Sequence, residues 1–281
     1  MNQHIQKNPN RNFLAGMLNL ILCLLCACFF GACRDMNAVV VAGSTSVQPY
    51  AEILAEEFMI LDPAKEVDVQ GGGSSAGITA VQTGAAEIGM SSRELKDEEQ
   101  LLWSVEIAKD GLAIIINPGN HIQNISIDQI RDIYAFKITN WSEIGGANKK
   151  IHIISREEGS GTRSAFEELI MGESRITPKA IIQDSNGAVR QLVADDPDSI
   201  GFISLGLVDK TVKALNLDNV KATRENILNG EYKLYRPFLF IARQKPEGDA
   251  MEYIDFVLSK HGQQLLSDEG LIPEQSGDQP I

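Results

Sequence analysis

The sequence predicts an α/β protein built on mostly parallel sheets, and three observations support this prediction. From residue 38 onward, short β-branched runs alternate with segments whose apolar residues recur at helical spacing. Three of these runs lead directly into a glycine-serine turn and then into a predicted helix. At 281 residues and 43% apolar composition, the chain has enough apolar material for one large or two medium cores.

Three strand–turn–helix units share one plan. Each strand contains two or three β-branched residues, and each turn is rich in glycine and serine. The apolar residues of the first and third helices share one face. The strand, turn and helix are residues 38–42, 43–46 and 47–58 in the first unit, 66–70, 71–75 and 76–82 in the second, and 150–155, 159–162 and 163–171 in the third. The repeated plan favours parallel strands.

Further elements continue the alternation of strands and helices. The remaining predicted strands are residues 111–117 and 238–242, and the remaining predicted helices are residues 126–136, 251–258 and 263–267. Pro118 ends the first of these strands, and Ser126 with Gln129 forms a capping box that opens a helix.

The first 32 residues differ from the rest of the chain. A polar start with Lys7 and Arg11 precedes an uncharged apolar stretch, residues 13–32, which is typical of an export signal. A permanent membrane-spanning helix is the alternative, because about 20 apolar residues suffice to cross a bilayer.

The cysteines favour an export signal. All four lie in or directly after the apolar stretch, at Cys23, Cys26, Cys28 and Cys33. The run from Phe30 to Cys33 (FGAC) resembles the lipobox of bacterial lipoproteins, which implies a signal peptide at residues 1–32, a lipidated Cys33 and a tether at 33–37. A competing lipobox ends at Cys28, and packing in an apolar helix is the simpler alternative. In either case the rest of the chain has no disulfide.

The chain is acidic, with a net charge of −13. Lys7 and Arg11 are the only formal charges in residues 1–32, so removing that segment takes the net charge to about −15. Nucleic-acid binding depends on basic patches, so we expect no nucleic-acid partner. An anion that binds here must be held by local donors rather than by the overall field.

The three turns predict an anion site. The first amide N–H groups of a helix lack intrahelical acceptors and carry the positive end of the helix dipole. Glycine allows close backbone approach, and serine or threonine adds a hydroxyl donor. One such turn is weak support, because serine and threonine are also ordinary N-caps. Ligands of parallel sheets bind at the edge where strands end and helices begin, so the three turns can converge there.

Two arginines lie close to these turns in the sequence. Arg156 precedes the third turn, and its planar guanidinium suits two oxygens of one oxyanion. Its alternative role is a surface ion pair with Glu157 or Glu158. Arg93 follows Ser91-Ser92 and either touches the anion or braces the acidic surroundings.

Six motifs together identify a family. They are residues 43–49 (GSTSVQP), 71–77 (GGGSSAG), 88–93 (IGMSSR), 138–146 (ITNWSEIGG), 156–162 (REEGSGT) and 200–203 (IGFI). With these motifs the chain resembles the periplasmic phosphate-binding proteins of bacterial ABC transporters, especially their lipoprotein form. The resemblance covers nearly everything after residue 37.

The resemblance implies a two-lobed, type II periplasmic-binding-protein fold with a hinge between the lobes. We expect lobe 1 at residues 38–117 plus 238–281 and lobe 2 at 118–237. The implied function is high-affinity binding of inorganic phosphate in the cleft between the lobes, with delivery to membrane permease subunits. We expect an exported monomer, anchored by its lipid to a bacterial membrane and facing the periplasm or cell exterior.

The resemblance also implies that neutral donors and one arginine hold the phosphate, and it indicates which residues they are. The candidates are Thr45, Ser46, Ser74, Ser75, Ser92, Arg93, Arg156, Ser160, Gly161 and Thr162. Well-known members have an aspartate at the position of Ser92, which accepts the phosphate proton and rejects sulfate. Serine lacks that charge, so the acceptor of the proton is left open, with Glu157 or Glu158 as substitutes. A receptor for a sulfate-like oxyanion, and a sensor or adhesion lipoprotein, are the alternative functions.

Other classes of function have little support in the sequence. The turn at residues 159–161 (GSG) lacks the G-x-S-x-G pattern of a nucleophile elbow, and His121, His152 and His261 lie near no serine motif. The phosphate loop G-x-x-x-x-G-K-[ST] is absent, and the histidines are too dispersed for a metal site. We therefore expect a binding protein rather than an enzyme, with no cofactor or metal. Trp141 and Phe202 are predicted to lie in the core.

Overall fold

The computed structural model describes residues 38–274. The predicted signal peptide at residues 1–32, the tether at 33–37 and the lipidation site Cys33 lie outside these residues. All described residues belong to one unit of the chain. Among them, no helix is long and apolar enough to cross a membrane.

Strands and helices alternate along this unit, as the sequence predicts. The strands are β1 (Val39–Gly43), β2 (Val67–Gly71), β3 (Ile88–Ser91), β4 (Trp103–Ile116), β5 (Asn124–Ile125), β6 (His152–Arg156), β7 (Ile181–Gln183), β8 (Ser199–Ser204), β9 (Lys213–Ala214), β10 (Asn216–Leu217), β11 (Tyr235–Ala242) and β12 (Ile272–Pro273). The helices are α2 (Gln48–Leu61), α3 (Ser74–Thr83), α4 (Ile127–Tyr134), α5 (Gly161–Phe166), α6 (Asn186–Asp195), α7 (Arg224–Leu228), α8 (Gly248–Leu258) and α9 (Lys260–Asp268).

The three predicted units are confirmed as β1–α2, β2–α3 and β6–α5. Two strands begin earlier than predicted: β4 at Trp103 rather than at residue 111, and β11 at Tyr235 rather than at residue 238. Both added segments contain charged residues or proline, which hid them in the sequence. They pair with each other in antiparallel register, which is a tertiary contact.

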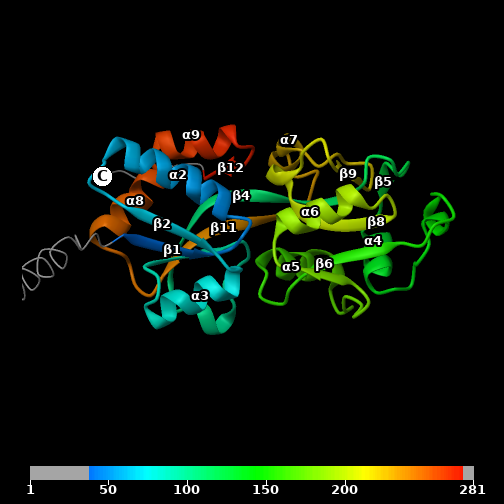
Figure 1. Ribbon diagram of the computed structural model, residues 1–281, viewed down its shortest axis with the longest axis horizontal. Helices are drawn as coiled ribbons and strands as arrows, with labels where there is room; N and C mark the ends of the chain where they lie inside the picture. Colours follow the sequence, from blue (N-terminus) through cyan, green and yellow to red (C-terminus); the bar gives the residue numbers. More distant parts are fainter. Residues whose placement is uncertain (1–37, 275–281) are drawn as a thin grey trace, which may run out of the picture. The chain divides into compact units, whose positions relative to one another are not determined.

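Ten of the twelve described strands form one mixed sheet, whose main path has the order β2-β1-β3-β11-β4-β8-β6-β7 (Figure 1), and β9 and β12 pair with β4. Strands β5 and β10 form a separate two-stranded sheet. At one end β1 pairs in parallel with β2 and β3, and at the other end β6 pairs in parallel with β7 and β8. The central pairs β3–β11, β11–β4 and β4–β8 are antiparallel. Figure 1 shows β4 and β11 running between two halves of the unit, a first half that contains β1, β2 and β3 and a second half that contains β6, β7 and β8. The sheet is therefore parallel at its ends and antiparallel where its halves join.

Strand β1 is buried on both faces, which explains its continuous apolar sequence. Val39 and Val41 belong to a core with residues of α2 and α8, whereas Val40 and Ala42 pack against the cluster that contains Ile78 of α3. The strand is thus held between helices, and its end at Gly43 has a fixed position beside the start of α2.

The second half has its own large core. Trp141 and Phe202 lie in it with 1% and 0% exposure, so their predicted core roles are confirmed. Phe202 stacks on Phe166 of α5 with ring centroids 4.1 Å apart. This packing fixes α5, whose N-terminus is the third predicted turn.

Strand β4 belongs to both halves. Its first part pairs with β11, whereas Leu112 to Ile116 pairs with β8. The predicted first lobe, residues 38–117 plus 238–281, therefore contains a segment that is hydrogen-bonded to the predicted second lobe, residues 118–237. Pro118 does end β4, but the strand has already crossed to the other half before it.

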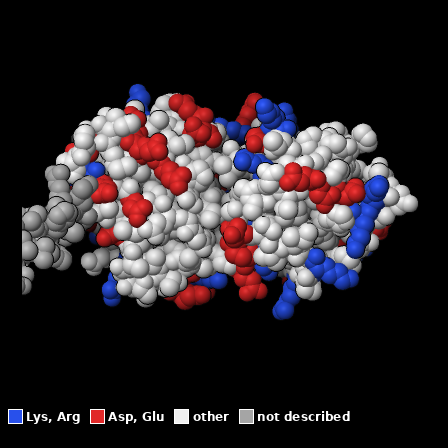
Figure 2. Space-filling model, in the orientation of Figure 1, with Lys and Arg blue, Asp and Glu red and all other residues white. Residues whose placement is uncertain are grey.

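The surface is consistent with the acidic composition. Figure 2 shows Asp and Glu side chains distributed over both halves of the visible face, with Lys and Arg side chains mainly toward its margins.

Candidate anion-binding site

The first turn is anchored to the backbone of β3. Gly43 has φ 141°, and a Cβ there would meet the backbone of Met90, so only glycine fits this close approach. Ser44 N donates to Met90 O at 3.0 Å. The following residues, Thr45 and Ser46, therefore project from the end of β1 at the start of α2.

The second turn lies directly beside the first. Gly73 has φ 93°, and its N–H donates to Gly43 O at 2.8 Å. Ser74 opens α3 and is fully buried, and its Oγ accepts the N–H of Ser92 at 3.1 Å. Ser75 N donates across to Gly159 O of the third turn at 3.1 Å.

The third turn closes the site from the other half of the unit. Ser160 caps α5, its Oγ accepting the N–H of Arg163 at 3.2 Å. Gly161 packs so closely on the second turn that a Cβ would clash with Ser74 Oγ and lie 2.6 Å from Ser92 Oγ. Thr162 Oγ1 lies 2.7 Å from Ser46 Oγ. The predicted convergence of the three turns is thus present.

Arg156 supplies the positive charge where the three turns converge, and it is 1% exposed. Its Nη2 donates to Thr45 Oγ1 at 3.1 Å, and Nε and Nη2 hold the Glu157 carboxylate at 3.0 Å each. Within residues 38–274, Nη1 is buried and has no hydrogen-bond partner. The guanidinium is therefore paired with Glu157, as the alternative reading expected, but it is buried at the three turns rather than on the surface.

Ser92 lies at the centre of a buried hydroxyl cluster. Its Oγ accepts a hydrogen bond from Ser44 Oγ at 2.9 Å and lies 3.5 Å from Ser74 Oγ. Glu157, one proposed substitute for the family's aspartate, has both oxygens bound to Arg156. The hydroxyls of this cluster are both donors and acceptors, so they suit an oxyanion that carries a proton.

Arg93 is the one predicted site residue whose side-chain contacts, within the described residues, lie away from the three turns. Its two Nη groups bind both oxygens of Glu99, at 2.7 and 2.9 Å, and Nη1 also donates to Glu94 O. The pair is nearly buried, with 4% and 10% of the side chains exposed. Arg93 thus braces the segment after β3, which was the second of its two predicted roles.

The sequence analysis missed four residues that are linked to Ser46 by hydrogen bonds, Asn186 and Arg236 directly and Asp110 and Ser204 through Arg236. Asn186 Nδ2 and Arg236 Nη2 donate to Ser46 Oγ at 2.8 and 3.1 Å. Asp110 accepts from Arg236 and, at 2.8 Å, from Ser204 Oγ. Asn186 opens α6 after Ser185, so a fourth strand–turn–helix unit, β7–α6, reaches the site. The sequence Ser-Asn-Gly at 185–187 is the only local signal of it.

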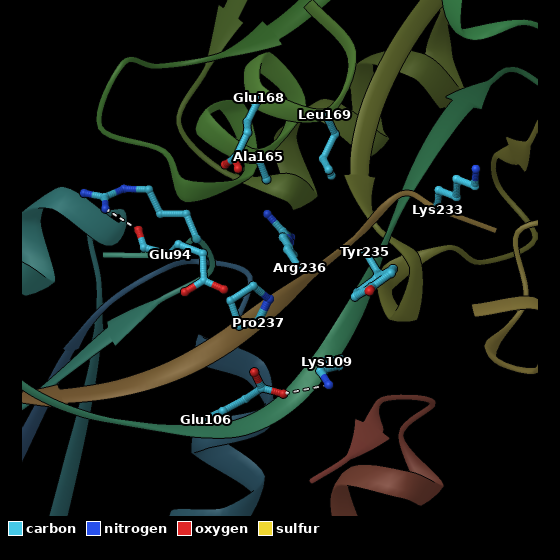
Figure 3. A pocket seen from close by; sticks show the side chains of 11 residues that line it. Glu94, Glu106, Lys109, Ala165, Glu168, Leu169, Lys233, Tyr235, Arg236 and Pro237 are labelled. Carbon is cyan, nitrogen blue, oxygen red and sulfur yellow. Dashed lines mark hydrogen bonds and ion pairs between the residues drawn. The ribbon is translucent and has the colours of Figure 1, made fainter. Parts of the chain in front are cut away.

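A cavity of about 400 Å³ lies on one flank of the site. Figure 3 shows the Arg236 side chain among its lining residues, between Ala165 and Leu169 of the second half and the strand residue Pro237. Glu106 and Lys109 of β4 form an ion pair at its rim, with 3.6 Å between Oε1 and Nζ. Among the predicted site residues, only Arg93 lines this cavity.

The histidines lie apart from the serine turns. His152 Nδ1 contacts Asp196 at 2.6 Å, and His261 Nε2 contacts Glu57 at 3.1 Å. Neither has a hydrogen bond to a serine of the turns in the described part of the chain. Within residues 38–274, the turns therefore present hydroxyl and guanidinium donors, and neither His152 nor His261 is positioned to activate one of their serines.

Comparisons with known proteins agree with this arrangement. A family model described as PBP superfamily domain matches residues 32–261. A Bacillus subtilis (strain 168) protein named phosphate-binding protein PstS is 32% identical over 246 residues, covering 85% of this chain and 82% of that protein.

Solved structures give the same result. A Clostridium perfringens structure with bound phosphate, assigned as a phosphate ABC transporter substrate-binding protein, matches with TM-score 0.82 and 42% identity, covering 85% of this chain and 100% of that one. A Vibrio cholerae structure of an ABC-type phosphate transport receptor matches with TM-score 0.71 and 38% identity, covering 84% and 100%.

Proposed function

Because the chain belongs to the PBP superfamily, among the phosphate-binding PstS proteins, we propose that it binds inorganic phosphate and delivers it to an ABC transporter permease. Membership confirms the predicted periplasmic-binding-protein fold and the prediction of a binding protein rather than an enzyme. The ligand is phosphate itself, and the chain acts as a monomeric receptor.

The convergence of three turns on one buried arginine supports this proposal most directly. Two turns come from one half of the sheet and the third from the other, and the Ser46 and Thr162 hydroxyls meet between them. We assign phosphate binding to Thr45, Ser46, Ser74, Ser75, Ser92, Arg156, Ser160, Gly161 and Thr162. Arg93 is left out, because its Nη groups bind Glu99 and Glu94 and, within residues 38–274, its side chain has no hydrogen bond to any of the three turns. Several charge-assisted hydrogen bonds in a dry site support micromolar or tighter affinity, about −8 kcal/mol or beyond.

Calorimetric titration of the purified chain, stripped of bound anion, tests this function. We expect tight binding of phosphate and weaker binding of sulfate, measured in the same buffer at two pH values. Equal affinities for the two anions would instead indicate a general receptor for tetrahedral oxyanions, since Ser92 lacks the family's charge. Binding of neither anion would contradict the proposed function and favour a sensor or adhesion lipoprotein.

We also propose two lobes joined where β4 and β11 cross between the halves. The two large hydrophobic clusters support this division, because one contains residues of β1, α2 and α8 and the other those of α4, α5 and β8. The pairing of Leu112 to Ile116 with β8 favours a crossing near Gly111. Phosphate that bridges turns of both lobes would favour the closed arrangement, which docks on the permease.

The proposed membrane anchor rests on the sequence alone. Cleavage after Ala32 would leave Cys33 as the first residue, with its thiol carrying the lipid. Cys33→Ser is then expected to leave the protein unprocessed or released from the membrane fraction of cells. A Cys28→Ser variant is the matched control, and loss of lipid in that variant alone would move the anchor to Cys28.

A further inference from the structure

Arg236 and Asp110 form a buried ion pair at the centre of the sheet. They are direct cross-strand partners in β11 and β4, with 3% and 1% exposure. Arg236 Nε and Nη2 donate to Asp110 Oδ2 at 3.2 and 3.0 Å. The pair lies outside the three turns, so the sequence pattern of the turns does not predict that it binds an anion.

The pair nevertheless reaches the site through Ser46. Ser46 Oγ lies within hydrogen-bonding distance of Arg236 Nη2 and Asn186 Nδ2, and both of these groups donate to it. A hydroxyl has two acceptor lone pairs and one proton, so the Ser46 proton remains free to be donated. The acceptor of this proton is either Thr162 Oγ1, at 2.7 Å, or an anion beside the two hydroxyls. Arg236 thereby makes Ser46 a donor.

The charges at the site also favour an anion beside Arg236. Burial lowers the pKa of Arg236, the Asp110 charge opposes this, and the Arg156 guanidinium lowers it further, so the two guanidinium groups are near enough to repel. Each retains an Nη1 that is buried without a partner within residues 38–274. Unpaired buried donors are costly, and a doubly charged oxyanion would satisfy both groups.

We propose that Arg236 is a second anion-binding guanidinium of the phosphate site and that Asp110 is its positioning residue. This inference rests on the proposed function and adds a cation from the joining strands to the donors of the turns. The rival explanation is purely structural, since a buried pair also links β4 to β11.

The test replaces the pair without leaving an unpaired charge. Asp110→Asn with Arg236→Gln keeps the net charge and two groups able to hydrogen-bond, and Arg236→Lys keeps the positive charge but not the fork. Asp128→Asn with Arg131→Gln neutralises a more exposed pair on α4, with 2.6 Å between its charged atoms, and is the control for the loss of one ion pair away from the site. Phosphate affinity of each full chain is measured by calorimetry, and folding by thermal unfolding without phosphate.

We expect the double variant at 110 and 236 to bind phosphate about 10- to 100-fold more weakly, because it loses charged hydrogen bonds to the anion. The phosphate affinity of the control variant should stay within about twofold of that of the unsubstituted chain. Arg236→Lys should recover part of this loss. Unchanged phosphate affinity of the double variant would overturn the proposal. An equal loss of affinity in the double variant and in Arg236→Lys, accompanied by lower thermal stability of both, would also overturn it, because it would indicate a purely structural role.

Two further results are decisive. If the double variant fails to fold, Arg236→Lys decides, because an ammonium lacks the planar fork that presents separate nitrogens to Asp110, Ser46 and an anion. Affinity equal to that of the unsubstituted chain would then overturn the proposal. Absence of phosphate binding by the unsubstituted chain would overturn the proposed function itself, and this inference with it.

Discussion

Ser46 Oγ and Thr162 Oγ1 lie 2.7 Å apart, although 116 positions separate the two residues in the chain. Ser46 precedes α2 in one half of the sheet, and Thr162 lies in the first turn of α5 in the other. Both side chains are 1% exposed. Their contact joins the two halves at the point where the turns converge.

Thr162→Val tests the contribution of one of these hydroxyls. Valine has nearly the same shape but cannot donate, so phosphate affinity is expected to fall about tenfold or more, the range for a hydrogen bond to a charged group. Thr83→Val removes an exposed hydroxyl at the end of α3 and should leave affinity within about twofold. Calorimetry on both variants makes the comparison, and equal affinities would remove Thr162 from the site.

Arg156→Ala is expected to weaken phosphate binding by well over tenfold, because it removes the cation at the three turns. Arg156→Lys should also bind weakly, since a lysine cannot hold Thr45 and both oxygens of Glu157 together. Arg131→Lys on α4 is the control substitution. Near-normal affinity of Arg156→Ala in a titration would contradict the site assignment.

Gly161→Ala places a methyl group between the second and third turns. The new Cβ would clash with Ser74 Oγ and crowd Ser92 Oγ, so the turns must separate and phosphate affinity should fall at least tenfold. Gly187 is a matched control at the start of α6, because a Cβ there meets nothing within 4 Å. Gly187→Ala should bind normally and be as stable or up to about 1 kcal/mol more stable. Similar affinities of the two variants would show that Gly161 is not close-packed against the site.

The three turns were predictable from sequence because their signals are local. A β-branched run, a glycine-serine turn and an amphipathic helix follow one another, and the ends of parallel strands must share an edge. Asn186 was missed because β7 has only three residues and its turn has a single glycine.

Asp110 and Arg236 could not be predicted in the same way. Each lies within a strand, and neither is near a glycine turn in the sequence. Their pairing depends on the antiparallel register of β4 and β11, which places residue 236 opposite residue 110. The predicted strand at residues 238–242 began just after Pro237, yet β11 runs through this proline. Sites built by long-range register are therefore visible only in the folded chain.

Glu99→Gln should destabilise the chain at neutral pH. The hydrogen bonds from Arg93 lower the pKa of Glu99 below its usual 4.5, although burial opposes them. A carboxyl with a lowered folded-state pKa contributes stability above pH 4.5, and that contribution is lost as the pH falls through the folded pKa. The variant should lose about 1 to 3 kcal/mol of unfolding free energy at pH 7, and less below pH 4. Urea unfolding at both pH values measures this, and a pH-independent difference would contradict it.

Glu106→Gln should have the opposite pH dependence. Burial raises the pKa of Glu106 to about 7, with the Glu274 carboxyl adding to the rise and Lys109 opposing it. Between pH 4.5 and 7 the folded chain therefore holds a proton that the unfolded chain has lost. As the pH rises through this window, the unsubstituted chain loses unfolding free energy because Glu106 must ionise in the folded state. The Glu106→Gln variant has no such loss, because glutamine is neutral at every pH.

The stability of Glu106→Gln relative to the unsubstituted chain should accordingly be greater at pH 8 than at pH 5. Urea unfolding at the two pH values gives the comparison, with Glu98→Gln as the matched substitution at an exposed glutamate. The effect should also shrink when Glu274→Gln removes the second carboxyl, because the two groups then no longer repel. A relative stability of Glu106→Gln that is the same at both pH values would mean that this carboxyl titrates in its usual range despite its burial beside Glu274.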